Sequence, residues 1–163
     1  MTDTLFAPPD THWQRLSPNY LRMKLTLIPL VWTVLSAAPA VVAFLVGPPW
    51  SGWAVVAAWA AMLAWRLLRA PRAFRRWGYA ERDTDVYLTS GLFHRRLVCV
   101  PYGRMQLVQL HSGPIDRVFK LATVEMITSS SQGSIVIPGL APDDAAALRD
   151  RLIRRGETQQ AGI

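Results

Sequence analysis

The stretch that decides the fold is LTLIPLVWTVLSAAPAVVAFLVG, residues 25–47, which contains no ionisable side chain. As an α-helix rising about 1.5 Å per residue it spans roughly 34 Å, and the hydrocarbon core of a bilayer is about 30 Å thick. A second apolar stretch, residues 50–65, follows a Pro-Pro pair at 48–49. It can cross if it continues to Leu68 with the Arg66 side chain reaching toward the headgroups. Since a Gly-Pro-Pro turn cannot continue a helix, the pattern predicts a membrane hairpin.

These apolar stretches allow two other interpretations. A buried hairpin in a soluble protein would need far more surrounding chain than follows residue 68. A cleaved signal peptide is suggested by Ala38-Pro39-Ala40, which fits a small-x-small cleavage site. However, the apolar run continues past that site and a second run follows at once, so a hairpin remains the better interpretation.

Positive charges flank the hairpin at its two ends and are absent from the turn at 47–52. Because Lys and Arg beside apolar spans stay on the cytoplasmic side, both termini are expected inside the cell. The basic residues concerned are Arg15, Arg22 and Lys24 before the first span and Arg66, Arg69, Arg72, Arg75 and Arg76 after the start of the second. Trp32 and Trp59 fall near the middle of the spans. Their side chains could contact the other helix, contact a partner or face lipid, and the sequence does not choose among these.

The overall charge supports a membrane surface better than a nucleic acid as the partner. Net charge is +7 and 51% of the residues are hydrophobic. A basic chain could bind nucleic acid, but in a membrane protein attraction to an anionic inner leaflet is simpler, at about 1 kcal/mol per basic residue near the surface. The single Cys99 fits a reducing compartment, and its apolar neighbours predict a buried, inert thiol.

From Gly78 the apolar periodicity changes to two, which is typical of short β-strands. The expected strands are 79–82, 85–90, 92–100, 105–111, 122–129 and 134–138. Ser90-Gly91 and Gln132-Gly133 are expected hairpin turns, and residues 114–120 one short helical turn. In 105–111 neither alternating set is purely apolar, so the pattern does not say which face points inward.

A final helix is expected from Pro142 to Gly156, with its arginines near the negative end of the helix dipole and Gly156 as terminator. Pro71 is expected to bend or interrupt the second membrane helix. The fold class is therefore α+β: a two-helix transmembrane hairpin and a small antiparallel β-barrel or sandwich capped by a C-terminal helix. The expected divisions are a flexible segment 1–17, the hairpin 18–70, the β domain 71–156 and a tail 157–163.

From about Trp13 to Arg155 the chain resembles the YdbS-like bacterial pleckstrin-homology (PH) domain membrane proteins. The Pro-x-x-Arg-Ile-Gln element of that family is matched by Pro101, Arg104, Met105 and Gln106. Other matching positions are Leu16-Ser17-Pro18, Tyr87, Leu88, Gly91, Leu92, Gly113, Arg117, Leu121, Thr128-Ser129 and Gly139-Leu140. Lys120 departs from the usual glycine, which puts the geometry of that turn in doubt.

The resemblance implies a PH-like fold and a non-enzymatic adaptor or assembly component of the bacterial cytoplasmic membrane. The partner that the resemblance implies is either another membrane protein or a further copy of this chain. A membrane protein with repeated PH-like domains is one such partner. The inositol phosphate binding of eukaryotic PH domains is not carried over, because no matching motif is present.

The residues themselves give no catalytic, cofactor or metal site. His12, His94 and His111 lack metal-ligand spacing and a nearby cysteine partner. Asp143-Asp144 is explained by its place at a helix start. We therefore expect no enzyme activity, no cofactor, no metal and no nucleic acid.

Two functional hypotheses follow. In the first, the β domain binds other membrane proteins, with Tyr102, Arg104 and Gln106 as candidate contacts and edge strands open to a partner. A structural alternative, rated higher for Arg104 and Gln106, has them hydrogen-bond the loop after Val100. In the second, Arg75, Arg76, Arg95 and Arg96 bind anionic lipid headgroups, although the first pair also serves as an orientation signal. Adjacent strand residues face opposite ways, so only one of Arg95 and Arg96 is expected in any single patch.

Overall fold

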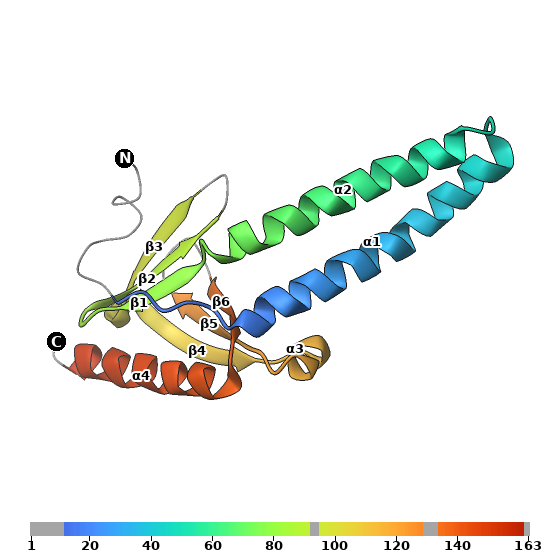
Figure 1. Cartoon of the computed structure of the whole chain (residues 1–163). Helices are drawn as coiled ribbons and strands as arrows, with labels where there is room; N and C mark the ends of the chain where they lie inside the picture. Colours follow the sequence, from blue (N-terminus) through green and yellow to red (C-terminus); the bar gives the residue numbers. More distant parts are fainter. Residues whose placement is uncertain (1–11, 92–94, 129–133, 162–163) are drawn as a thin grey trace. The chain divides into compact units, whose positions relative to one another are not determined.

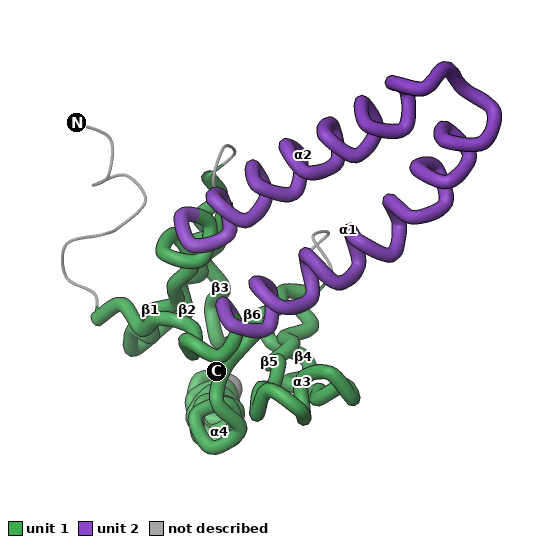
Figure 2. Tube along the Cα trace, turned by 45° about the vertical axis from the view of Figure 1, so that its right-hand side comes forward, with its two compact units in different colours: residues 1–20, 73–163 green, residues 21–72 purple. Residues whose placement is uncertain are grey.

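The computed structural model describes residues 12–91, 95–128 and 134–161. These residues belong to two compact units (Figure 2). One unit is Leu21–Arg72, and the other joins Met1–Tyr20 with Ala73–Ile163. The predicted turn at Gln132-Gly133 and the start of the strand expected at 92–100 lie outside the described residues.

Two long helices form the first unit and confirm the predicted pair of apolar helices. Helix α1 runs over Pro18–Val46 and α2 over Ser51–Phe74, and both are long and apolar enough to cross a membrane. The Ser17 hydroxyl accepts a hydrogen bond from the Asn19 amide at 3.4 Å, at the helix start that a Ser-Pro pair predicts. Pro71 was expected to bend or interrupt this helix, and the interruption was wrong, since α2 continues past Pro71 to Phe74.

Aromatic side chains hold α1 against α2. The rings of Trp32 and Trp59 have centroids 4.8 Å apart, and the Arg66 guanidinium lies 4.6 Å from the centre of the Trp32 ring. Nearer the turn, Gly52 leaves room for the Phe44 ring, because a Cβ at that position would clash with it. The two mid-span tryptophans therefore make the helix–helix contact that the sequence had left open.

The second unit contains two three-stranded antiparallel sheets (Figure 1). Sheet A has the order β1-β2-β3, with β1 Gly78–Glu81, β2 Asp85–Ser90 and β3 Arg96–Pro101. Sheet B has the order β4-β5-β6, with β4 Met105–His111, β5 Ala122–Thr128 and β6 Ser134–Leu140. A 3₁₀ turn, η1 (Tyr102–Arg104), links the sheets, and α3 (Pro114–Val118) links β4 to β5. The structure thus confirms the α+β fold class.

Helix α4 (Pro142–Ala161) closes the domain by packing against η1, β4 and β5. Its apolar stripe is fully buried, as predicted, with Ala145, Leu148 and Leu152 each at most 1% exposed. Its end was predicted wrongly, because the helix continues five residues past Gly156. That glycine is buried, and a Cβ at its position would lie 3.8 Å from the Tyr102 carbonyl oxygen, so it lies on the packed face of α4 instead of ending the helix.

A β-bulge explains why the β4 pattern could not be interpreted. Met105 pairs with Thr128, and the next registered pair is Leu107 with Ile127, so Gln106 is the extra residue. The bulge changes the parity of the strand. Residues three positions apart normally face opposite sides of a strand. Because of the bulge, Met105 and Val108 both face the core, with Val108 paired to Met126.

Residues 14–17 are part of the β domain, which corrects the prediction of a flexible segment through residue 17. The Gln14 and Tyr79 backbones exchange two hydrogen bonds of 2.8 and 3.0 Å, and Leu16 is only 4% exposed in the core. The Ser17 amide donates to the Gly139 carbonyl at 2.9 Å. Gly139 has φ +69 and faces the Tyr20 ring so closely that a Cβ would clash.

Candidate interaction surfaces of the β domain

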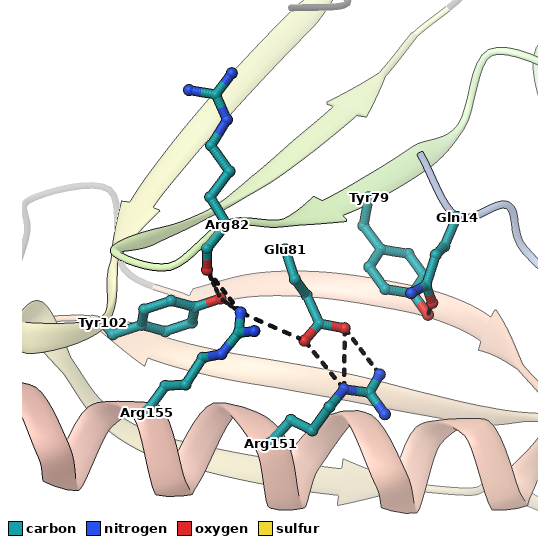
Figure 3. Close-up of polar contacts among 7 residues, drawn as sticks. All are labelled: Gln14, Tyr79, Glu81, Arg82, Tyr102, Arg151 and Arg155. Atoms are coloured by element: carbon teal, nitrogen blue, oxygen red, sulfur yellow. Dashed lines mark hydrogen bonds and ion pairs between the residues drawn. The ribbon is translucent and has the colours of Figure 1, made fainter. Parts of the chain in front are cut away.

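A network of polar side chains joins α4 to β1 and η1 (Figure 3). Glu81, whose side chain is 8% exposed, accepts hydrogen bonds from Arg151 Nε at 3.0 and 3.2 Å and from Nη2 at 2.8 Å. Arg155 Nη1 lies 3.8 Å from the second Glu81 oxygen and donates to the Arg82 carbonyl at 2.6 Å. This network stabilises the fold, since its carboxylate is held by two cations away from solvent.

Tyr102 belongs to this network, and its candidacy as a surface contact was wrong. It is 0% exposed, its hydroxyl donates to the Arg82 carbonyl at 3.0 Å and it accepts from Arg155 Nη1 at 2.9 Å. Burial raises the pKa of this hydroxyl above its ordinary value. The neutral phenol therefore fixes η1 beneath α4 and is not available to a partner.

The sequence pattern did not predict Glu81, Arg151 and Arg155 as a group. The α4 arginines were expected to complement the helix dipole, whereas in the structure two of them lie beside the Glu81 carboxylate on β1. A usable signal was present: Arg151 and Arg155 are four residues apart and share one helix face next to the apolar stripe. Such a pair on a packed helix predicts a buried acidic partner on another element.

The remaining polar groups of the described residues lie at separate places in the domain. Within the described residues, no group of three or more His, Cys, Asp or Glu side chains is arranged to hold a metal. His111 Nε2 lies 3.0 Å from a Glu125 oxygen on the neighbouring strand, and His94 lies outside the described residues. Asp143 and Asp144 occupy the first turn of α4, as predicted.

Cys99 is exposed, so the prediction of a buried thiol was wrong. Its neighbours Val98 and Val100 point into the core and Cys99 points away, as the period of a strand requires. The thiol donates to an Asp85 oxygen at 3.2 Å. Partial burial, followed by this contact with the carboxylate, raises the pKa of the thiol. It therefore stays protonated, which suppresses nucleophilic reactivity.

The four candidate lipid-binding arginines gather at one end of sheet A. Gly78 pairs with Thr89, Thr89 with Leu97, and Ser90 with Arg96. The start of β1, the end of β2 and the start of β3 therefore lie at the same end of sheet A. Arg75 and Arg76 lie two and three positions before Gly78, the first residue of β1, and Arg95 directly precedes β3. Arg95 precedes the strand, so the alternation rule that separated it from Arg96 does not apply to it. Arg75, Arg76 and Arg96 are exposed and Arg95 is half-buried.

Arg104 and Gln106 lie apart from that end of sheet A, at the junction of η1 and β4. Both are exposed. The structure shows no side-chain hydrogen bond from either residue to the loop after Val100 in the part of the chain that it describes. The structural alternative for these two residues is therefore wrong.

The outer face of sheet B carries the apolar residues of this region. Leu107 and Ile127 are cross-strand partners, and Val136 on β6 is the partner of Glu125. Leu107 is 46% and Val136 38% exposed. In the described residues β4 hydrogen-bonds to β5 on one side and to no strand on the other, and α4 packs against β4.

Comparison with known proteins agrees with this architecture. The model of the bacterial PH domain family matches residues 24–156, which is most of the chain. The chain therefore belongs to the bacterial PH domain family. It is similar to the UPF0699 transmembrane protein YdbS of Bacillus subtilis (strain 168), with 35% identity over 78 residues.

That similarity covers 48% of this chain and 48% of the relative, so the chain spans about half the length of the curated relative it matches. No solved structure matches the chain significantly. The two apolar helices and the transmembrane relative together define a PH-like domain in a YdbS-like membrane protein.

Proposed function

We propose that this protein is a multi-pass, non-catalytic interaction module of the bacterial cytoplasmic membrane, with both termini in the cytoplasm, whose β domain binds another membrane protein. The observations that carry the proposal are the apolar outer face of sheet B and the edge of β4 that pairs with no described strand. An exposed strand edge accepts a partner strand through main-chain hydrogen bonds, and neighbouring apolar side chains supply contact area.

The orientation part of the proposal rests on the distribution of charge. The exposed arginines at the start of β1 follow α2 directly, and the turn between α1 and α2 contains no Lys or Arg. Basic residues beside a span stay in the cytoplasm. A reporter fused after Ile163 should therefore be active only in its cytoplasmic form, and activity of a periplasm-specific reporter would refute this orientation.

Site-specific photocrosslinking in native membranes tests the binding surface. A photoreactive residue at Leu107 or Val136 should yield the same crosslinked membrane protein, identified by mass spectrometry. The matched control is Glu157, an exposed residue of α4, which should yield none. Identical products from all three positions, or none from the two β positions, would contradict the proposal. The mass of the product separates a protein with repeated PH-like domains from a second copy of this chain.

A second candidate function, binding of anionic headgroups, is favoured by the convergence of four arginines at one end of sheet A. Arg75 and Arg76 are also orientation signals, so they are left intact in the test. Arg95→Gln with Arg96→Gln should lower the ratio of phosphatidylglycerol to phosphatidylethanolamine that co-purifies with the full chain. Arg149→Gln with Arg154→Gln removes equal charge from α4 and should not. An unchanged ratio in the first variant would exclude this function.

A further inference from the structure

Residues 13–20, which we call the strap, lead into α1 and connect the two sheets (Figure 1). Among the strands of the described residues, β1 pairs only with β2 and β6 only with β5. The strap reaches both of these edge strands. The Gln14 and Tyr79 backbones exchange hydrogen bonds of 2.8 and 3.0 Å at β1. The Ser17 amide donates to the Gly139 carbonyl on β6 at 2.9 Å. Sheets A and B are therefore joined on this side by the strap and not by a strand ladder.

Glycines in β1 and β6 give the strap room to dock. A Cβ at Gly78 would lie 3.4 Å from Trp13 Cε3 and 3.4 Å from the Gln14 carbonyl oxygen. A Cβ at Gly139 would clash with the Tyr20 ring, and the φ of +69 at this position also favours glycine. Both sheets are therefore shaped to receive this segment.

The strap is held less extensively than the strands. It forms one isolated bridge with sheet A, whereas neighbouring strands pair along their length. Within residues 12–20, Leu16 alone is buried, at 4% exposed. In the described residues Trp13 Nε1 is buried without a hydrogen-bond partner, and water would satisfy this donor if the strap left. Segments with few buried contacts open before the whole fold does, so the strap should have low local stability.

The rest of the domain has connections of its own. Each sheet has its antiparallel pairing, and η1 links β3 to β4. Helix α4 packs against η1, β4 and β5, and its Arg151 donates to Glu81 of β1 at 2.8 Å. None of these contacts involves the strap. Loss of the strap would therefore free the edges of β1 and β6 and leave these other links in place.

We propose that the strap is a releasable closure of the β domain, which leaves β1 and β6 as one unit while both sheets stay folded. Release uncovers main-chain groups at the edges of β1 and β6, together with the core position of Leu16. Such edges bind an extended segment through main-chain hydrogen bonds. The strap therefore blocks, within its own chain, a binding site for an extended segment that carries the strap's own pattern. This site is separate from the outer face of sheet B, to which the proposed function assigns the partner.

Hydrogen exchange of the full-length protein in mild detergent, read residue by residue by NMR, tests release in the natural chain. The amides protected by strap contacts are those of Gln14, Ser17 and Tyr79. After correction for intrinsic rates they should exchange at least tenfold faster than the amides of Val124 and Met126 on the central strand β5. Equal rates in the two groups would show that the strap opens only when the whole domain unfolds, which overturns the proposal.

A peptide that competes for the strap site tests binding. Leu16→Ala in the full chain weakens the strap and leaves the residues of both sheets unchanged. A fluorescent synthetic peptide of residues 12–20 should bind this variant at least tenfold more tightly than the natural chain, as measured by fluorescence anisotropy. The same peptide carrying Leu16→Ala should bind neither protein. Arg15→Ala alters an exposed residue of the strap, so this control should bind the peptide no better than the natural chain does.

Failure of the unaltered peptide to bind folded Leu16→Ala protein would overturn the strap proposal. A Leu16→Ala chain without a cooperative unfolding transition would also overturn it, because the sheets would then need the strap in order to fold. Equal binding to all three proteins would show nonspecific attachment of the peptide, which overturns the proposal too. Crosslinking from Leu107 and Val136 concerns a different surface and is read separately.

Discussion

Arg151 on α4 donates hydrogen bonds from Nε and Nη2 to the carboxylate of Glu81 on β1, with donor–acceptor distances of 2.8 to 3.2 Å. The two residues are 70 positions apart in the chain, and the Glu81 side chain is 8% exposed against 35% for Arg151. Bidentate pairs of this kind specify orientation as well as adding energy. This pair fixes the rotation of α4, so that its leucines face the core.

Replacing Arg151 with Ala should destabilise the domain by about 1–3 kcal/mol, because the buried carboxylate keeps only the more distant Arg155. The free energy of unfolding of the full chain in mild detergent, followed with denaturant, measures the effect. Arg149→Ala is the matched control, since its partner Asp150 is its exposed neighbour, and it should change stability by less than about 0.5 kcal/mol. Equal losses in both variants would contradict a special role for Glu81.

Lys120→Gly should stabilise the protein by about 1 kcal/mol. Lys120 has φ 52, a left-handed conformation that costs a residue with a Cβ about 1–2 kcal/mol and costs glycine little. Part of this gain is offset by the larger entropy of glycine in the unfolded chain. Lys120→Ala removes the same charge but keeps the strain, so its midpoint of unfolding should stay near that of the natural chain. A gain in both variants would assign the effect to charge.

Trp32→Leu should weaken the helical hairpin by about 1–2 kcal/mol, because it removes the ring contact with Trp59 and the face beneath Arg66. The temperature at which half of the purified protein aggregates in detergent reports this loss. Trp50→Leu alters a 69% exposed ring near the turn and should leave that temperature nearly unchanged. If the Trp32 ring stabilises the charge of Arg66, then Arg66 is left without this contact in Trp32→Leu. Adding Arg66→Leu to Trp32→Leu should in that case recover part of the stability.

Stability should fall as pH rises from about 10 to about 12. Burial, followed by the nearby Glu81 carboxylate, raises the pKa of Tyr79 from 10.0 to about 12. In this window the unfolded chain loses the phenol proton and the folded chain keeps it, so the folded state binds more protons and loses stability as pH increases. Tyr79→Phe should flatten the pH dependence of the unfolding midpoint in this window. An unchanged slope in that variant would assign the alkaline loss to other groups.

The sequence predicted elements whose signals are local. Gly91 adopts φ 102, although the turn predicted at Ser90-Gly91 was wrong for Ser90, which ends β2 and pairs with Arg96. Helix α1 begins at Pro18 after a serine, as predicted. Lys120 shows the limit of such reasoning: a departure from the family glycine suggested a different turn, yet the backbone there keeps a left-handed conformation that glycine favours. Local sequence sets preferences, whereas the hydrogen bonds that Asp116 accepts from the Gly113 and Leu121 amides impose the conformation at a cost in strain.

The candidate site was predicted less completely, because exposure is a tertiary property. Tyr102 looked like a surface aromatic and is wholly buried, while Val118, which attracted no prediction, is among the most exposed apolar residues. Arg95 and Arg96 join Arg75 and Arg76 at one end of sheet A through strand register. No spacing along the chain shows that register, because the strands that create it are separated by turns of variable length.

The sequence by itself determined the two apolar helices, the turn between them, most strand positions and the amphipathic stripe of α4, since hydrophobic periodicity and helix-ending residues act over a few neighbours. Only the tertiary structure decided that Gln14 to Ser17 complete the β domain, that a bulge turns Met105 inward, and that Glu81 binds Arg151. Each of these features depends on contacts between segments far apart in the chain. The free energy of such contacts cannot be predicted from a pattern of neighbouring residues.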